Sequence, residues 1–269
     1  MSNPFDLDGR VIVVTGAMGQ LGREFCRELA GRGARVAALD RAAGEAASRA
    51  AIDPGAGRLL EVQADVTSRE SLDAALRRIA ADLGVPHGLV NAAALDSPPG
   101  APAEENGPLE TYPERAWDRV MDVNLKGTLL CGQVFGGAMA EAGRGAIVNI
   151  SSTYGVVSPD QRLYDYRREA GAPFFKPIAY SASKSALLNV TRYMATYWAP
   201  RNVRVNTVTF GGVFNGQDER FLAGYAARVP LGRMARPDEY NGAIVFLLSD
   251  ASSYMTGSNL VIDGGWTAW

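Results

Sequence analysis

The sequence predicts an α/β fold, a single doubly wound domain built on a parallel sheet of seven strands. Short apolar runs rich in β-branched residues alternate along the chain with helical stretches of about ten or more residues, as in successive strand–helix–strand units. The runs are continuously apolar, which is typical of strands covered on both faces. The chain has 269 residues and no linker or shift in composition, so we expect one domain spanning residues 1–269.

In chain order, strands are expected at residues 10–15, 34–40, 58–66, 87–93, 145–152, 202–210 and 259–265. Helices are expected between them at residues 23–33, 68–84, about 113–142, 180–199 and 237–250, with a weaker one at 42–51. Ser68 is expected to cap the second long helix and Gly84 to close it. Three stretches lack a clean period: we interpret 97–108 as a loop, 157–177 as an irregular insertion, and 211–230 as an irregular segment with some helix.

The composition excludes several classes of protein. A net charge of −2 leaves no basic footprint for nucleic acid, and no apolar run reaches the roughly 18 residues of a membrane span. The N-terminal residues hold no apolar signal region, so the expected location is the cytoplasm. Cys26 and Cys131 lie in apolar helical stretches and are interpreted as buried thiols of a reducing compartment. The one histidine, His87, suits a structural role at a strand edge, and no metal site is expected.

A glycine-rich turn follows the first expected strand and opens the first helix. Gly16 allows a tight turn, and Gly19 and Gly22 let a ligand approach the backbone closely. The helix N-terminus adds free N–H groups and a partial positive charge, which together bind phosphate. In this strand–helix context the turn predicts a Rossmann-type dinucleotide site. The alternative is an ordinary strand–helix turn with conveniently placed glycines.

Asp40 ends the second strand, where a carboxylate can accept hydrogen bonds from both hydroxyls of the adenosine ribose and would repel a 2′-phosphate. Arg41 follows directly and could partly reverse this preference, and Asp40 could also be only a turn residue. We therefore expect NAD, with NADP the less favoured cofactor. The ends of the third and fourth strands complete the expected crevice with Asp65, Val66, Asn91, Ala92 and Ala93.

Tyr180 and Lys184 carry the chemistry that the sequence predicts. They stand four residues apart in a helical stretch, on one face and one turn apart. A free phenol has a pKa of about 10, and a fixed ammonium beside it favours the phenolate, which can then act as a base near neutral pH. Lysine is scarce here, because the 27 basic residues include only Lys126, Lys176 and Lys184. The alternative is an amphipathic helix with an exposed lysine.

With these residues in place, the sequence resembles the short-chain dehydrogenase/reductase family over nearly its whole length. The matching pieces are TGAMGQLG (15–22), Asp65-Val66, NAA (91–93), VNLKG (123–127), IVNISS (147–152), YSASK (180–184), PLGRMARPDEY (230–240) and VIDGG (261–265). The resemblance implies hydride transfer between a nicotinamide and a secondary alcohol or its ketone. It implies that Tyr180 exchanges the proton and that Ser152 hydrogen-bonds the substrate oxygen. It also implies that Lys184 lowers the Tyr180 pKa and binds the nicotinamide ribose, with Asn124 holding a water behind Lys184. Further cofactor contacts are expected from Met18, Gln20, Leu21, Gly211 and Val213.

Three departures from the family pattern bear on function. Gln20 takes a place usually held by glycine, so the glycine spacing resembles the family's extended branch. We nevertheless expect simple dehydrogenase chemistry, because the sequence stops just after VIDGG, where that branch carries a substrate domain. Phe210-Gly211 replaces a usual Pro-Gly, so a less rigid loop is expected there. The gap between Ser152 and Tyr180 is much longer than usual.

That gap holds the insertion 157–177, which we expect to form a flap over the substrate and to be partly mobile without it. Arginine forks suit carboxylate or phosphate, and aromatic rings suit a sugar face. The expected substrate contacts are Arg162, Arg167 and Arg168, with Thr153 and Asn215 outside the insertion. The alternative is a solvated flap or a subunit contact.

The pieces STYGVVSPD, GGVFNGQ and DGGWTAW are also similar to a subgroup linked to bacterial surface sugars, namely flagellin glycans and nonulosonic acids. Together with the insertion, this favours a small, polar, sugar-like or anionic substrate. Two other functions stay open: an NADPH-dependent ketoreductase of the acyl-carrier or lipid type, and a dinucleotide-sensing or scaffold protein without catalysis. The polar insertion speaks against the first, and the complete catalytic set against the second.

A homotetramer, or else a homodimer, is expected as well. The family resemblance implies such an assembly. In addition, Trp266 and Trp269 would place two indoles at a chain end that is otherwise exposed to solvent.

Overall fold

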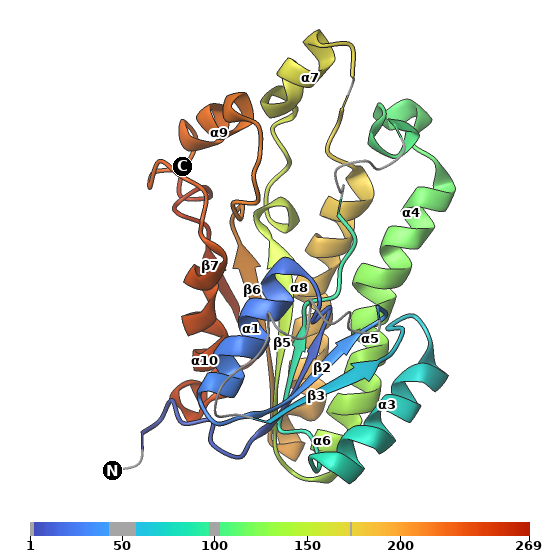
Figure 1. The fold of residues 1–269 in the computed structure, drawn as a ribbon, viewed down its shortest axis with the longest axis vertical. Helices are drawn as coiled ribbons and strands as arrows, with labels where there is room; N and C mark the ends of the chain where they lie inside the picture. The colour runs from blue at the N-terminus through green and yellow to red at the C-terminus, as the bar shows by residue number, and fades with distance from the viewer. Residues whose placement is uncertain (1–2, 43–57, 97–102, 173) are drawn as a thin grey trace.

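The computed structural model describes residues 3–42, 58–96, 103–172 and 174–269. Within these residues one parallel sheet runs in the order β3-β2-β1-β4-β5-β6-β7 (Figure 1). The strands are β1 (Val11–Thr15), β2 (Arg35–Asp40), β3 (Arg58–Gln63), β4 (Gly88–Asn91), β5 (Gly145–Ser152), β6 (Val203–Phe210) and β7 (Asn259–Ile262). The order reverses between β1 and β4, so the predicted doubly wound fold is confirmed.

The long helices are α1 (Gln20–Gly31), α3 (Arg69–Asp82) and α8 (Ile178–Trp198), and the shorter ones are α7 (Asp165–Glu169), α9 (Glu219–Ala226) and α10 (Asn241–Leu248). The helix expected near 113–142 consists of α4 (Glu114–Met121), α5 (Gly127–Cys131) and α6 (Gly137–Glu141), joined by π-helical turns at Asp122–Lys126 and Gly132–Gly136. None of the helices in the described part of the chain combines the length and the apolar character that crossing a bilayer requires.

Two apolar layers cover the sheet, because successive strand residues point to opposite faces. Ile12 of β1 packs with α1 and α10 on one face, and its neighbour Val13 packs with α3, the 114–141 helix and α8 on the other. Cys26 lies in the first layer and Cys131 in the second, so the sheet separates the two buried thiols and both are free. The expectation that they form no disulfide is confirmed.

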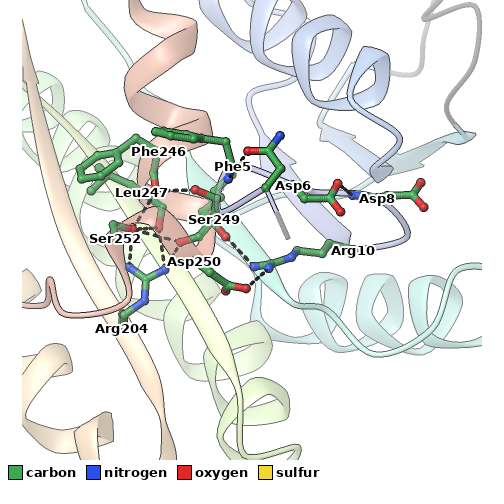
Figure 2. A network of polar contacts seen from close by, with 12 residues as sticks. Phe5, Asp6, Asp8, Arg10, Arg204, Phe246, Leu247, Ser249, Asp250 and Ser252 are labelled. Carbon is green, nitrogen blue, oxygen red and sulfur yellow. Dashed lines mark hydrogen bonds and ion pairs between the residues drawn. The ribbon is translucent and has the colours of Figure 1, made fainter. Parts of the chain in front are cut away.

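Two arginines hold the amino ends of the strands against the C-terminal end of α10 and the segment that follows it (Figure 2). Arg204 of β6 donates to two backbone carbonyls in 247–249, at 2.9 and 3.1 Å, and to Ser252 Oγ at 2.8 Å. Arg10, just before β1, donates to a third carbonyl of this segment at 3.1 Å and pairs with Asp250 at 2.8 Å. A helix C-terminus leaves its last carbonyls without helical partners, and cations there are favourable. These arginines therefore close the end of α10.

The insertion 157–177 differs from the sequence prediction, which assigned it no regular structure. It contains a 3-10 turn at Gln161–Tyr164 followed by α7. Five residues are too few for an apolar period to show in the sequence. The insertion packs on the 211–230 segment through a third apolar cluster, in which the Tyr164 ring lies against that of Phe221, tilted by 36° and with 5.5 Å between the centroids. Both α7 and α9 stand at the end of the molecule that holds the C-terminus (Figure 1).

Some sequence expectations have other outcomes. The third strand ends at Gln63 and not at 66. The region expected to form the last helix, 237–250, is a 3-10 turn at Pro237–Tyr240 followed by α10. Most of the weak helix at 42–51 and half of the loop at 97–108 lie outside the described residues.

Candidate active site

The turn after β1 is built for close approach of its backbone to other atoms. Gly16 has a φ of +65°, and a Cβ there would lie 2.7 Å from the Cα of Ala93. A Cβ at Gly22 would lie 2.1 Å from the Gly16 carbonyl oxygen. The N-cap of α1 is Gly19, which offers no side-chain cap, whereas Ser68 caps α3. The first N–H groups of α1 are therefore left for a ligand, as in phosphate-binding helix ends.

A cavity of about 220 Å³ lies beside this turn. It is lined by Gly16, Gly19, Asp40, Arg41, Ala64, Asp65, Val66, Ala92, Ala93, Ala94, Leu95 and Val123. Asp40 Oδ2 accepts a hydrogen bond from the Met18 N–H at 2.9 Å, which fixes the carboxylate beside the turn. Asp65 instead accepts bonds from the N–H and Oγ1 of Thr67, which lower the Asp65 pKa and tie that side chain to its own loop.

A second cavity, of about 340 Å³, shares Ala92 and Ala94 with the first. Its wall brings together the expected residues Gln20, Leu21, Ser152, Thr153, Tyr180, Lys184, Gly211, Val213 and Asn215. The two cavities form one crevice at the carboxyl ends of the strands, from Asp40 at one end to Tyr180 at the other. An extended dinucleotide fits this arrangement, with its adenosine half at Asp40 and its nicotinamide half near Lys184.

Tyr180 and Lys184 lie beside each other, with Lys184 Nζ 5.9 Å from the Tyr180 ring centroid. Lys184 is 4% exposed, and its ammonium donates to the Ile150 carbonyl oxygen at 2.7 Å. Burial lowers the Lys184 pKa to about 8. Burial and the Asp96 carboxylate raise the Tyr180 pKa above its ordinary value, against a hydrogen bond with Ser152 that lowers it. In the protein alone the expected lowering is thus outweighed by desolvation.

Asn124 occupies the first π-helical turn and is 1% exposed. Its side chain accepts from the Leu95 N–H at 2.7 Å and donates to the Leu95 carbonyl and to Ser183 Oγ, both at 3.0 Å. The side chain therefore ties the loop after β4 to α8, one turn from Tyr180. Such π-helical turns frequently occur at functional sites.

Asn91 lies behind the crevice, while its neighbours Ala92 and Ala93 line it. Its amide donates to Asn149 Oδ1 at 2.8 Å, and Asn149 donates in turn to Thr191 Oγ1 at 2.8 Å. This buried chain links two strands and α8. The side chain of Asn91 thus braces the sheet, and only its backbone neighbours reach the cofactor cavity.

The loop at Gly211 is held on both sides. Its N–H donates to the Ile262 carbonyl at 2.9 Å, and its own carbonyl accepts from the Tyr240 hydroxyl at 3.1 Å. The next N–H, of Gly212, donates to the Tyr225 hydroxyl at 2.6 Å. These bonds supply the constraint that the missing proline would otherwise provide.

The three arginines expected to bind substrate do not line either cavity. Arg162 is exposed and pairs with Asp160 at 2.8 Å. The Arg167 guanidinium lies over the Phe174 ring at 4.4 Å, and Arg168 donates to two backbone carbonyls at 2.9 Å each. All three hold the shape of the insertion, so their predicted contact with substrate gains no support from this geometry.

Further polar residues line the larger cavity: Tyr164 and Lys176, which belong to the insertion expected beside the active site, and Asp96, Tyr154 and Gln217, which the sequence prediction did not include. A signal for Lys176 was present in the sequence. It is one of three lysines in an arginine-rich chain, the same scarcity that marks Lys184. No comparable signal marks Asp96, since its place in the wall depends on the path of the loop after β4.

Comparison with known proteins agrees with this geometry. Residues 16–267 match the family model described as enoyl-(acyl carrier protein) reductase. The chain is 39% identical to a cis-4-hydroxycyclohexanecarboxylate dehydrogenase of Sinomonas cyclohexanicum, over 96% of this chain and 97% of that protein. It is 37% identical to a D-threitol dehydrogenase of Mycolicibacterium smegmatis, over 98% and 95%. A crystal structure of a short-chain type dehydrogenase/reductase from Mycobacterium marinum matches with a TM-score of 0.85 and 31% identity, covering 100% of both chains.

The chain therefore belongs to the short-chain dehydrogenase/reductase family. It is an NAD(P)-dependent oxidoreductase that transfers a hydride between nicotinamide and a secondary alcohol or its ketone. This finding excludes the non-catalytic sensor or scaffold.

Proposed function

We propose that the protein uses NAD to oxidise a secondary alcohol on a small, polar, polyhydroxylated substrate. The larger cavity supports this, because hydroxyl, amide and charged side chains lie around Tyr180. Such side chains bind hydroxyl groups and would be left unpaired against an apolar substrate. A relative at 37% identity is named for a polyol, D-threitol. The charged and hydroxyl side chains around Tyr180 argue against an acyl-carrier or lipid substrate.

Bound NAD supplies the hydride acceptor, and the residues of this chain hold the alcohol and take its proton. Ser152 hydrogen-bonds the reacting oxygen and Tyr180, and Tyr180 accepts the hydroxyl proton. Because burial raises the Tyr180 pKa, the phenolate depends on positive charge nearby. Lys184 provides it, and its low exposure keeps the charge unscreened. Asn124 positions α8 and the loop after β4 around this pair.

The choice of NAD rests on the fixed position of Asp40. Its carboxylate lines the smaller cavity and is anchored by the Met18 N–H, so a 2′-phosphate would meet a negative charge that cannot swing away. The test is kcat/KM with each cofactor. We expect NAD to be preferred by at least about tenfold, or about 1.4 kcal/mol. A preference for NADP would contradict the proposal and implicate Arg41, which lines the same cavity.

We further propose that the insertion 157–177 covers the substrate as part of the single domain. Tyr164 and Lys176 contribute to the cavity wall. Asp160 of the insertion pairs with Arg228 of the 211–230 segment at 2.7 Å. This pair joins two segments that are far apart in the sequence into one cover over the larger cavity.

A homotetramer or homodimer is the proposed assembly. Tyr193 and Tyr197 of α8 are 70% and 59% exposed and stack on each other, and Trp269 is 81% exposed. Aromatic side chains on an open surface are typical of interfaces. Trp266 no longer supports the assembly, since it stacks on Tyr225 within the chain at 4.8 Å. Light scattering should give a mass above the 28.6 kDa of one chain, and a monomer at micromolar concentration would contradict the proposal.

The proposed location is the cytoplasm. Its support is that Cys26 and Cys131 are both free thiols, and free thiols persist in reducing compartments.

A further inference from the structure

Lys176, near the end of the insertion, places a second ammonium group in the substrate cavity. Its side chain is 9% exposed, lines the larger cavity and forms an ion pair with Asp96. The Lys176 ammonium lies 4.6 Å from the centroid of the Tyr180 ring and 6.0 Å from that of Tyr154. A small substrate whose hydroxyl reaches Tyr180 therefore has this ion pair within reach of its neighbouring atoms.

The backbone of Lys176 is fixed by one side chain. The Lys176 N–H donates to Gln161 Oε1 at 2.9 Å, and Gln161 Nε2 donates back to the Lys176 carbonyl at 3.2 Å. Pro177 follows directly as the N-cap of α8, the helix that carries Tyr180. The ammonium is thus held between the insertion and the catalytic helix. Such pre-organisation suits a group that recognises substrate.

The charges along the wall favour a neutral ligand over an anion. The cavity-lining residues include one acidic side chain, Asp96, and two basic ones, Lys176 and Lys184. Lys184 points to the Ile150 carbonyl, and Lys176 is paired with Asp96. An anionic group placed at Lys176 would meet the Asp96 carboxylate. Two adjacent hydroxyls fit instead, because one can accept from the ammonium while the other donates to the carboxylate.

We propose that the Lys176–Asp96 pair is the specificity site of this enzyme and binds a vicinal diol of a neutral polyol, beside the carbon that is oxidised. This rests on the proposed function, since it requires the substrate alcohol to face Tyr180. The pair recognises the substrate because it places a hydrogen-bond donor, Lys176, beside an acceptor, Asp96. It also disfavours hydroxy acids, through the charge of Asp96.

Three small alcohols separate these contributions: butane-2,3-diol, butan-2-ol and 3-hydroxybutyrate. The first two differ by one hydroxyl, and the third carries a carboxylate. The wild-type kcat/KM should be about tenfold or more higher for the diol than for butan-2-ol, the effect of a hydrogen bond to a charged group. Lys176→Met should lower this ratio about tenfold, mainly through KM. Asp96→Asn should lower it too, and should raise kcat/KM for 3-hydroxybutyrate about tenfold by removing the repelling charge.

Lys126→Met is the matched control, because Lys126 pairs with Asp122 on the helix surface and lines neither cavity. The Lys126→Met variant should leave kcat/KM unchanged for all three compounds. An unchanged diol ratio in Lys176→Met would overturn the proposal, as would a wild-type preference for 3-hydroxybutyrate. Equal losses of kcat with both alcohols and a shifted pH profile would show that Lys176 acts on Tyr180 instead, and would also overturn it.

The same assays test the proposed function independently of the diol site. If wild-type protein oxidises butan-2-ol with NAD, the dehydrogenase assignment stands whatever the ratios are. If it oxidises neither butan-2-ol nor butane-2,3-diol, nor any alditol of four to six carbons, both the proposed function and the proposed diol site are wrong.

Discussion

At the amino ends of the strands, Arg10 and Arg204 donate to backbone carbonyls and to Asp250 and Ser252 (Figure 2). At the carboxyl ends, by contrast, charged and hydroxyl side chains face a cavity of about 340 Å³. Each cluster holds a cation that is withdrawn from water, Arg204 partly and Lys184 almost completely. The donors of the first cluster all bond to the protein itself, whereas the side chains of the second line a cavity that a substrate can enter. Substitutions in the two clusters should therefore change different properties, stability in one and turnover in the other.

The largest separation is expected for Lys184→Met. Removing the ammonium should lower kcat/KM by about 10³-fold, within the range of a group that supports proton transfer. The free energy of unfolding should stay the same or rise, because burial already lowers the Lys184 pKa and a buried cation carries a desolvation cost. Turnover with NAD and urea denaturation check the two halves. A loss of stability together with activity would mean that Lys184 is mainly structural.

Arg204→Met should have the opposite effect, a loss of stability with little change in activity. It removes donors from the Leu247 and Ser249 carbonyls and from Ser252, so unfolding should become easier by about 3 kcal/mol. Activity per folded molecule should stay within about threefold. Arg236→Met is the control, because Arg236 is exposed and pairs with Asp238 and Glu239, close to it in the chain; its effect should stay within about 0.5 kcal/mol. Equal stability of the two variants would contradict the role given to Arg204.

A smaller effect is expected from pH at the same end of the sheet. His87 Nδ1 accepts a hydrogen bond from the Val11 N–H at 3.1 Å, so it must be neutral there. Burial, followed by Arg144, Arg10 and Arg35, lowers the His87 pKa below its ordinary 6.5. The unfolded chain therefore takes up this proton more readily. The contribution to stability should be complete above pH 6.5 and be lost as pH falls through the folded-state pKa.

The loss should be about 1 kcal/mol, the usual worth of one hydrogen bond. Denaturation midpoints between pH 7.5 and 5.5 measure it, with His87→Leu as the control. The variant should lack this component of the pH dependence. Identical slopes for wild type and variant would show that His87 does not titrate with folding.

The two ends also differ in how far the sequence predicts them. Strands read as apolar runs, and Gly16, Ser152, Tyr180 and Lys184 sit in short local motifs, so both the fold and the centre of the crevice follow from neighbouring residues. The Lys176–Asp96 pair joins positions 80 apart in the chain and depends on the tertiary path of two loops. Composition alone suggested that the arginines of the insertion face the substrate, whereas they bind aspartate, an aromatic ring and backbone carbonyls within it.

The raised pKa of Tyr180 likewise depends on residues that are distant from it in the sequence. The sequence places Lys184 one turn away, and this alone suggests a lowered value. Burial in the folded protein and the carboxylate of Asp96 act in the opposite direction. Neither can be read from the spacing of Tyr180 and Lys184.

Tyr180→Phe tests most directly whether the carboxyl-end cluster performs proton transfer. The substitution removes one hydroxyl and keeps the ring. NADH binding, followed by fluorescence, and the free energy of unfolding, within about 1 kcal/mol, should both be retained. Turnover of a secondary alcohol with NAD should fall by about 10³-fold or more. Turnover within about tenfold of wild type, or about 1.4 kcal/mol, would show that another group takes the proton and that this account of the site is wrong.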